Sequence, residues 1–227
     1  VGLGVGVCEG RVHALGQASM LNLSNSIVSG NAANSDGGGI FVFGATANIV
    51  NSTVAHNLAG AGGGGIGLQN SGSGTATVGL THVTVAFNRT QTAGGGISLI
   101  SGSLTLKNTL IAGNVAANNA DLAAAFISQG YNLVQSRGTS SGYIATDRPN
   151  GTDPQASFAT FNGGPTNTVR LAAASPAVNV IPAGNCAGIT IDQRGYRRPS
   201  ANCDIGAYEV EGVLPPVLVF LNGFEQN

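Results

Sequence analysis

Charged side chains are scarce in this sequence. Only 8% of its 227 residues are Asp, Glu, Lys or Arg, against roughly 25% in an ordinary soluble domain. Lys107 is the single lysine, the formal net charge is −1, and no run of basic residues occurs. Nucleic-acid binding requires Lys and Arg side chains that neutralise phosphates. The composition therefore excludes nucleic acid as a partner.

Long apolar runs are also absent. The longest candidate, PVLVFLNGF at residues 216–224, is much shorter than the roughly 20 residues that a membrane-spanning helix needs. We therefore expect no transmembrane segment. The chain does not begin with Met and shows no charged segment followed by an apolar one, so a secretion signal is either removed or never existed. Tryptophan is missing, yet 42% of the residues are hydrophobic, which is enough for a sizeable core.

The chain has three cysteines, an odd number. Cys186 and Cys203 lie in one compact C-terminal segment and would close a modest loop, so they are the favoured disulfide pair. Such a bond is worth about 3 kcal/mol through loop-closure entropy, and it indicates an oxidising compartment. The alternative is three reduced, buried thiols. Cys8 stands alone near the start and is free, paired with an upstream residue, or paired with another molecule.

Four segments repeat one pattern. They are NSIVSGN (25–31), NSTVAHN (51–57), HVTVAFN (82–88) and NTLIAGN (108–114), with starts separated by 26, 31 and 26 residues. The isoleucines that close three glycine runs, Ile40, Ile66 and Ile97, keep the same spacing. The period is therefore a property of the chain and not an accident of its composition.

Apolar residues alternate with polar ones inside each unit, as they do in β-strands. The shared apolar positions are Leu23, Ile49, Leu80 and Leu106, and then Val28, Val54, Val85 and Ile111. A single unit cannot bury its apolar row, but stacked units turn these rows into continuous internal ladders. We therefore predict an all-β fold, a parallel β-helix or solenoid with adjacent coils roughly 4.8 Å apart.

The repeats also align two columns of asparagine. One column holds Asn25, Asn51, His82 and Asn108, and the other holds Asn31, Asn57, Asn88 and Asn114. Amides stacked in this way can hydrogen-bond along the column, and asparagine tolerates the left-handed backbone of sharp bends. Both columns are predicted to be structural ladders, with His82 as a hydrogen-bonding member.

Glycine runs at 37–39, 62–65 and 94–96 precede the strands that start at the isoleucines. We predict bends there, where a positive φ and the close approach of neighbouring coils leave no room for a Cβ atom. The period weakens beyond residue 120. The expected organisation is coils of 26–31 residues over 1–120, a last coil and irregular cap over 121–212, and a hinged apolar tail over 213–227. The cap is expected to cover the open end of the stack, which would otherwise be an exposed edge.

The stretch CAGITIDQRGYRRPSANCDIGAYE (186–209) carries a family resemblance. It resembles the C-terminal module of bacterial secreted β-helix proteins of the choice-of-anchor Q type, whose pattern is DQRG, then RP, then CDIGA with an aromatic residue and Glu. The upstream glycine and Asn-ending repeats look like those of the same proteins and of polymorphic outer-membrane proteins. The resemblance implies a right-handed parallel β-helix, export and an extracellular life, and brings no catalytic residues. FLNGFE (220–225) looks like a short tail of some Gram-negative secreted proteins.

Catalytic carboxylates are sparse across the repeats. Asp36 and Asp121 lie far apart in the repeat register, whereas glycoside hydrolysis needs two carboxylates that face one sugar. Asp147 and Asp153 flank a turn and are better explained as solvated turn charges. The three histidines show no metal-ligand spacing. We therefore expect no catalytic residues, no metal and no cofactor.

The densest charge in the chain lies near its C-terminal end. The residues are Asp192, Arg194, Arg197, Arg198 and Asp204. The main interpretation is an internal ion-pair network that holds the cap together. The alternative is a binding site for an anionic glycan or a carboxylate.

These patterns predict a non-catalytic structural or adhesive protein, secreted or on the outer surface of a Gram-negative bacterium. Its partners would be surface glycans or copies of itself, because Asn, Ser and Thr side chains offer many weak hydrogen bonds. A sharper hypothesis is head-to-tail assembly into fibres, in which the tail of one subunit adds a strand to the next. The residues assigned to this contact are Cys8, Val217, Val219, Phe220 and Phe224. The tail could equally fold back on its own cap or be a sorting signal, and the alternative function is a polysaccharide-active lyase or hydrolase, or a glycan-binding β-helix.

Overall fold

The computed structural model describes residues 2–3, 7–8, 12–15, 19–199 and 201–214, with the backbone alone before residue 19. Val217, Val219, Phe220 and Phe224, assigned above to assembly, lie outside the described residues. Within them the regular structure is nearly all β-strand, and a single short 3₁₀ helix spans Ala183–Asn185. The predicted all-β class is confirmed.

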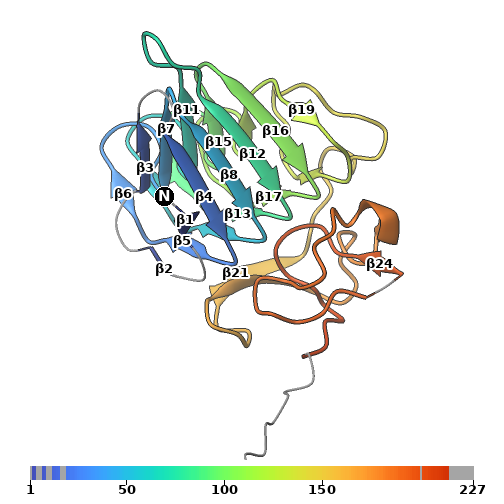
Figure 1. Cartoon of the computed structure of the whole chain (residues 1–227). Coiled ribbons are helices and arrows are strands. Elements are labelled where there is room, and N and C mark those ends of the chain that lie inside the picture. The colour runs from blue at the N-terminus through green and yellow to red at the C-terminus, as the bar shows by residue number, and fades with distance from the viewer. Residues whose placement is uncertain (1, 4–6, 9–11, 16–18, 200, 215–227) are drawn as a thin grey trace, which may run out of the picture.

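Four parallel sheets carry the repeats (Figure 1). The front sheet, nearest the viewer, holds β1 (Gly2–Leu3), β4 (Met20–Ser24), β8 (Thr46–Val50), β12 (Thr77–Thr81), β16 (Ser103–Lys107) and β19 (Ile127–Ser128). The flank sheet holds β2 (Val7–Cys8), β5 (Ile27–Ser29), β9 (Thr53–Ala55), β13 (Thr84–Ala86), β17 (Leu110–Ala112) and β20 (Leu133–Val134). The back sheet holds β3 (Val12–Leu15), β7 (Ile40–Phe43), β11 (Ile66–Gln69), β15 (Ile97–Leu99) and β18 (Leu122–Ala123), and the small sheet holds β6 (Ala32–Ala33), β10 (Leu58–Ala59) and β14 (Arg89–Thr90).

The chain visits these sheets in a fixed order. Each of the three central repeats, which start at β4, β8 and β12, runs through the front, flank, small and back sheets in turn, and the described strands before and after them extend the front, flank and back sheets. Residues that share a place in the sequence pattern are direct Cα partners, as Ile40, Ile66 and Ile97 are in the back sheet. This arrangement is consistent with the predicted solenoid. The inward aliphatic side chains stack into one continuous core that runs through all the repeats.

Each glycine of a run meets a different constraint. Gly63 has a φ of 67°, in the left-handed region. A Cβ at Gly64 would lie closer than 3.0 Å to backbone atoms of Arg89 and Gly95, and one at Gly65 would collide with the side chain of Asn88. The glycine run is therefore a bend packed tightly against the next repeat, as the sequence predicted.

Residues 121–151 close one end of the stack. Leu122 continues the back sheet beside Ile97, and Leu133 continues the flank sheet beside Leu110. The ring of Tyr143 then packs edge-on against Phe126, with ring centroids 4.9 Å apart. The strands thus continue past residue 120, although the sequence period fades there.

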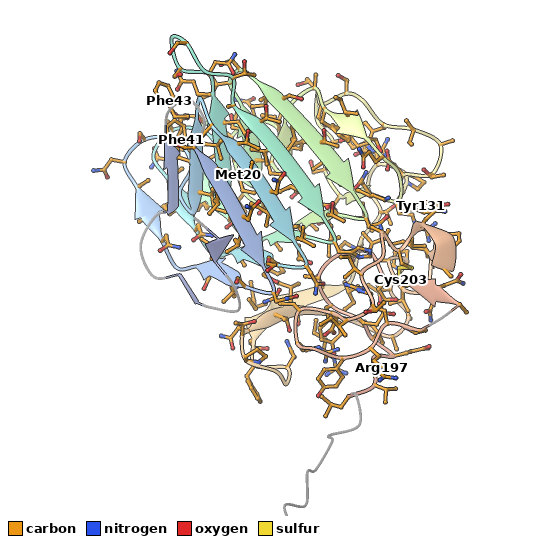
Figure 2. The ribbon with its side chains drawn as sticks, in the orientation of Figure 1. Met20, Phe41, Phe43, Tyr131, Arg197 and Cys203 are labelled. Carbon is orange, nitrogen blue, oxygen red and sulfur yellow. A yellow bond between two sulfur atoms is a disulfide. The ribbon has the colours of Figure 1, made fainter. Side chains whose placement is uncertain are left out.

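The C-terminal module, residues 152–214, contains two antiparallel strand pairs. Strand β21 (Ala156–Thr160) pairs with β22 (Thr168–Leu171), and β23 (Ile181–Pro182) pairs with β24 (Asn202–Cys203). The predicted disulfide between Cys186 and Cys203 is confirmed and lies in this module (Figure 2). Its loops are otherwise irregular.

The C-terminal module lies beside the stack, whereas the cap over 121–212 was expected to cover its open end. It packs against the outer face of the flank sheet, below the repeats in Figure 1. The Thr53 hydroxyl donates to Gln193 Oε1 at 2.6 Å, and the Ala207 backbone N–H donates to Thr84 Oγ1 at 3.0 Å. The outer face of the flank sheet carries alanine and threonine side chains together with Leu110 and Leu133, and these two leucines pack into the apolar core of the module.

Candidate functional site

The second asparagine column is a continuous buried hydrogen-bond ladder. The Nδ2 atoms of Asn31, Asn57 and Asn88 donate to the Oδ1 atoms of Asn57, Asn88 and Asn114 at 2.9, 2.9 and 3.0 Å. Asn114 donates in turn to Asp121 Oδ1 at 2.9 Å. The carboxylate of Asp121 therefore ends the ladder, and burial raises its pKa. The Asp121 carboxylate accepts a hydrogen bond from the ladder and is buried, so it does not face solvent as a catalytic group would.

The first column has the left-handed backbone expected of it. Asn25, Asn51, His82 and Asn108 have φ values of 49°, 49°, 51° and 53°. Asn51 donates to Asn25 at 2.7 Å, and Asn108 meets His82 at 2.9 Å. No hydrogen bond joins Asn51 to His82 among the described residues. Instead, Asn51 donates to the Ile191 carbonyl and accepts from Arg198, each at 3.1 Å, so this column anchors the C-terminal module.

His82 is a buried, neutral member of the first column. Burial, assisted by the charge of Arg198, lowers its pKa to about 3. Its Nε2 lies 2.9 Å from Asn108 Nδ2, which can only donate, and its Nδ1 lies 3.4 Å from the Gly206 carbonyl, which can only accept. These partners assign the proton to Nδ1. The ring holds two segments together and has no lone pair left for a metal.

The charge cluster forms inside the C-terminal module. Arg194 pairs with Asp192 at 2.7 Å and Arg198 pairs with Glu209 at 2.6 Å, and all four side chains are buried. The carboxylate of Asp204, also buried, accepts from the backbone N–H groups of Asn179 and Val210. The structure therefore brings together Asp192, Arg194, Arg198 and Asp204 as an internal network.

Arg197 does not belong to this network. It is exposed, at the lower edge of the module in Figure 2, and no ion pair of its guanidinium occurs among the described residues. The backbone of Arg197 pairs as a β-bridge with Ile191 and Val213. Since side chains alternate along an extended segment, Arg197 points away when Arg198 points inward.

Glu209 is a member of the cluster that the sequence interpretation missed. Its Oε2 accepts from Arg198 and from the Asp204 backbone N–H, at 2.6 and 3.1 Å. Burial and the neighbouring Asp204 raise the pKa of Glu209 to about 7. Its position five residues after Asp204, at the end of the same motif, was the signal for including it.

Arg194 is held in place by aromatic rings as well as by its carboxylate partner. Its guanidinium lies 4.1 Å from the centroid of the Tyr196 ring and 3.8 Å from that of Tyr208. Its Nη2 also donates to the Glu209 carbonyl at 2.7 Å. Because two aromatic rings stack on the guanidinium and its N–H groups are hydrogen-bonded, the Arg194 side chain is fully occupied by contacts within the protein.

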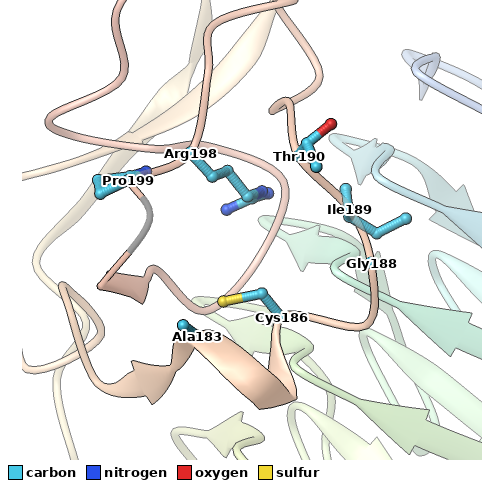
Figure 3. A pocket seen from close by; sticks show the side chains of 7 residues that line it. All are labelled: Ala183, Cys186, Gly188, Ile189, Thr190, Arg198 and Pro199. Atoms are coloured by element: carbon cyan, nitrogen blue, oxygen red, sulfur yellow. The ribbon is translucent and has the colours of Figure 1, made fainter.

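A pocket of about 260 Å³ borders the cluster (Figure 3). Its lining includes Cys186, Ile189, Thr190, Arg198 and Pro199, with the Arg198 side chain reaching in from above and Cys186 facing it from below. Thr190 also borders two neighbouring hollows of about 280 and 410 Å³. In the described part of the chain, the buried charge cluster thus lies next to a concave surface at this pocket.

Of the remaining acids named above, Asp153 borders a small hollow of about 160 Å³, and no second carboxylate of the described residues lines it. Asp147 is buried and accepts from Ser128 and from the backbone and side chain of Asn132. Arg148 donates to the Pro176 carbonyl, and Asp153 accepts from the Gln155 backbone N–H. Each of these charges is used to fix a turn.

Cys8 lies in β2 and is the Cα partner of Val28. Val28 is fully buried, as is Val54 in the next repeat.

The outer face of the front sheet is flat and uncovered by the C-terminal module (Figure 1). Its outward rows are Met20, Thr46, Thr77 and Ser103; Asn22, Asn48, Gly79 and Thr105; and Ser24, Val50, Thr81 and Lys107. Asn48 donates to Asn22 at 3.2 Å. Strands β4, β8, β12 and β16 contain no Asp or Glu. Hydroxyl and amide groups thus recur on this face at the inter-strand spacing of about 4.8 Å.

In the described ranges no helix is long and apolar enough to cross a bilayer, and no group of three or more His, Cys, Asp or Glu side chains could hold a metal ion. Comparison of the chain with protein-family models, with curated proteins and with solved structures finds no match.

Proposed function

We propose that this chain is a non-catalytic adhesive or structural protein that contacts polysaccharide through the outer face of its front sheet. The observation that carries the proposal is the array of hydroxyl and amide side chains on that face. Sugars present hydroxyl groups at regular intervals, and a flat row of donors and acceptors can pair with many of them weakly. The absence of carboxylates from these strands removes the pair that hydrolysis needs.

The finer fold assignment is part of this proposal. We assign the repeats to a right-handed parallel β-helix of the choice-of-anchor Q type. The support is the fixed order in which the chain visits its sheets and the DQRG and CDIGAYE motifs. The motif residues Asp192, Arg194, Asp204 and Glu209 pack together in one cluster, which gives the motif a structural reason.

Secretion to the outer surface of a Gram-negative bacterium is the location that fits this role. The Cys186–Cys203 disulfide supports an oxidising compartment. Head-to-tail assembly through the C-terminal tail stays a proposal of its own, and its test appears in the Discussion.

Gly79 offers a sharp test of the front face. A Cβ there would meet only Asn48 Oδ1, at an ordinary 3.5 Å, so a side chain can leave the backbone at this position without a clash at Cβ. Gly79→Tyr should weaken binding to insoluble polysaccharide by about tenfold by lifting a flat polymer off the face, whereas Gly79→Ser should bind like the wild type. Co-sedimentation with cellulose, chitin and peptidoglycan measures this. If no polymer is retained by the wild type, or if Gly79→Tyr binds as well, the front face is not the contact surface.

A further inference from the structure

The middle row of the front sheet contains a ladder of side-chain amides that stops halfway. Asn48 Nδ2 donates to Asn22 Oδ1 at 3.2 Å, and the next positions in the row are Gly79 and Thr105. Asn48 Oδ1 accepts no hydrogen bond from any described residue. This oxygen lies 3.5 Å from the place of a Cβ at Gly79, and no other atom outside residues 78–80 lies within 4 Å of that place. The ladder therefore ends in an open acceptor beside an unfilled position.

Hydroxyl and methyl groups surround the unfilled position. Thr77 and Thr81 lie two residues before and two residues after Gly79 on β12, so their side chains leave the same face of the sheet. Thr105 is the Cα partner of Gly79 on β16, and all three threonines are exposed or half-buried. A group over Gly79 would thus have an amide oxygen on one side, a hydroxyl on the other, and methyl groups before and after it along the strand.

An acetamido group matches this set of neighbours. Its N–H donates, its carbonyl accepts, and its methyl group is apolar. Amides that hydrogen-bond in a stack repeat at about 4.8 Å, which is also the spacing of adjacent strands. An acetamido group over Gly79 would therefore continue the ladder, donating to Asn48 Oδ1 and accepting from the Thr105 hydroxyl. A sugar hydroxyl at the same place would reach the oxygen but would leave the methyl contacts unused.

The charge of the face favours a neutral polymer. Lys107 is the only charged residue of β4, β8, β12 and β16. Without a carboxylate in these strands, an ammonium group of a deacetylated polymer would have no ionic partner there. One lysine at the end of its strand attracts a polyanion only weakly, because exposed ion pairs contribute little.

We propose that the front sheet binds polysaccharides built from N-acetylamino sugars, with one acetamido group seated over Gly79 in line with Asn22 and Asn48. This inference rests on the proposed function, because it takes the front face as the contact surface, and it adds the class of polymer. It distinguishes chitin from cellulose, since the two share their ring and linkage and differ in an acetamido group against a hydroxyl.

Co-sedimentation of the full chain with four insoluble polymers tests the proposal. The polymers are chitin, chitosan prepared from it, the same chitosan after re-acetylation, and cellulose. The two acetylated polymers should bind about fivefold more tightly than the other two, as expected for about one additional hydrogen bond. Equal binding to all four would overturn the acetamido site and leave the front face as the contact surface, whereas retention on none of them would overturn both proposals.

A matched pair of variants locates the acetamido group. Gly79→Asn would fill the position with an amide of the protein itself, so the ratio of chitin binding to cellulose binding should fall about fivefold, to near one. Gly72→Asn, at an exposed glycine with no atom within 4 Å of the new Cβ, should keep the wild-type ratio. Circular dichroism checks that both variants fold. A wild-type ratio in Gly79→Asn would overturn the site over Gly79.

Discussion

Glycine and asparagine occupy complementary places in each repeat. The last glycine of a run leaves the space that an asparagine carboxamide fills: a Cβ at Gly65 would lie 2.9 Å from Asn88 Nδ2, and one at Gly39 would lie 2.8 Å from Asn57 Nδ2. The amide can therefore reach both its neighbour in the ladder and a strand carbonyl. A buried polar group is tolerated because all of its donors are used.

Gly64→Ala should destabilise the protein strongly. The added Cβ would overlap backbone atoms of Arg89 and Gly95, and backbone cannot move aside without breaking the parallel pairing. We expect a loss of about 3 kcal/mol in the free energy of unfolding, at the upper end for overpacking. Urea denaturation measures it. Gly72→Ala, where no atom lies within 4 Å of the new Cβ, is the control and should be neutral. Equal stability of the two variants would contradict the tight bend.

His82 should make stability depend on pH. Its pKa is about 3 in the folded protein against 6.5 when unfolded, so below pH 6.5 the unfolded chain takes up a proton that the folded chain refuses. Stability contributed by the neutral ring is therefore complete above pH 6.5 and is lost as the pH falls toward 3. Between pH 7.5 and pH 4.5 the loss should be about 2–3 kcal/mol.

His82→Asn should remove this part of the pH dependence, since asparagine accepts the same left-handed backbone and does not titrate. Urea midpoints measured from pH 4.5 to 7.5 give the comparison. His56→Asn, at an exposed position that also has a positive φ, is the control and should change the slope less. The difference between variant and wild type isolates His82 from Glu209, whose raised pKa of about 7 lowers stability as the pH rises from 4.5 to 7.

At the scale of elements, the sequence predicts which segments of the repeats form strands, but it does not predict which face of the stack the C-terminal module packs against. The apolar columns of Leu23, Ile49 and Leu80 are local patterns, and they set strand, face and register together. The contact of Thr53 with Gln193 spans 140 residues, and no periodicity links the two. The alanines that face outward on the flank sheet were the sequence signal for this contact, because alanine is uncommon on the exposed face of a strand.

The candidate site was predicted in part, for a similar reason. The density of charged residues in the sequence identified Asp192, Arg194 and Arg198. It could not show that Arg198 belongs to the cluster and Arg197 does not, because that depends on the direction in which each side chain points. The pocket arises from the loop at 188–191 and from Pro199, and its shape depends on tertiary packing.

The disulfide should matter chiefly for the C-terminal module. It closes a loop between residues 17 apart, which corresponds to about 3 kcal/mol. The double variant Cys186→Ser, Cys203→Ser should therefore release the module at lower urea than the repeats, so that unfolding shows two transitions. Hydrogen exchange of the amides at 177–207 measures it, with reduced wild type as the matched control. A single transition at the wild-type midpoint would show that side-chain packing alone holds the module.

At the scale of the whole molecule, one sheet is covered and another is free. The flank strands are buried on both faces, by the core of the repeats inside and by the C-terminal module outside, whereas the front strands alternate between buried and exposed residues. The uncovered face is the one rich in hydroxyl and amide groups. Under the proposed function, the front sheet supplies the contact surface and the flank sheet holds the C-terminal module.

Removing residues 215–227 should abolish head-to-tail assembly if the tail supplies a strand to the next subunit. The truncation keeps Val213, which bridges to Arg197, so the module should stay folded. Negative-stain microscopy and light scattering compare the full chain with the truncated one. Fibres of unchanged length after truncation would show that the tail is not the link. Cys8→Ser, with and without reductant, distinguishes a disulfide-linked polymer from a strand-linked one.

The attachment of the C-terminal module spans three consecutive repeats. Asn51 bonds to Ile191, Thr84 to Ala207 and Asn108 to Asn185. Detaching the module would therefore require breaking hydrogen bonds to all three repeats, so the module fastens neighbouring repeats to one another as well as to itself.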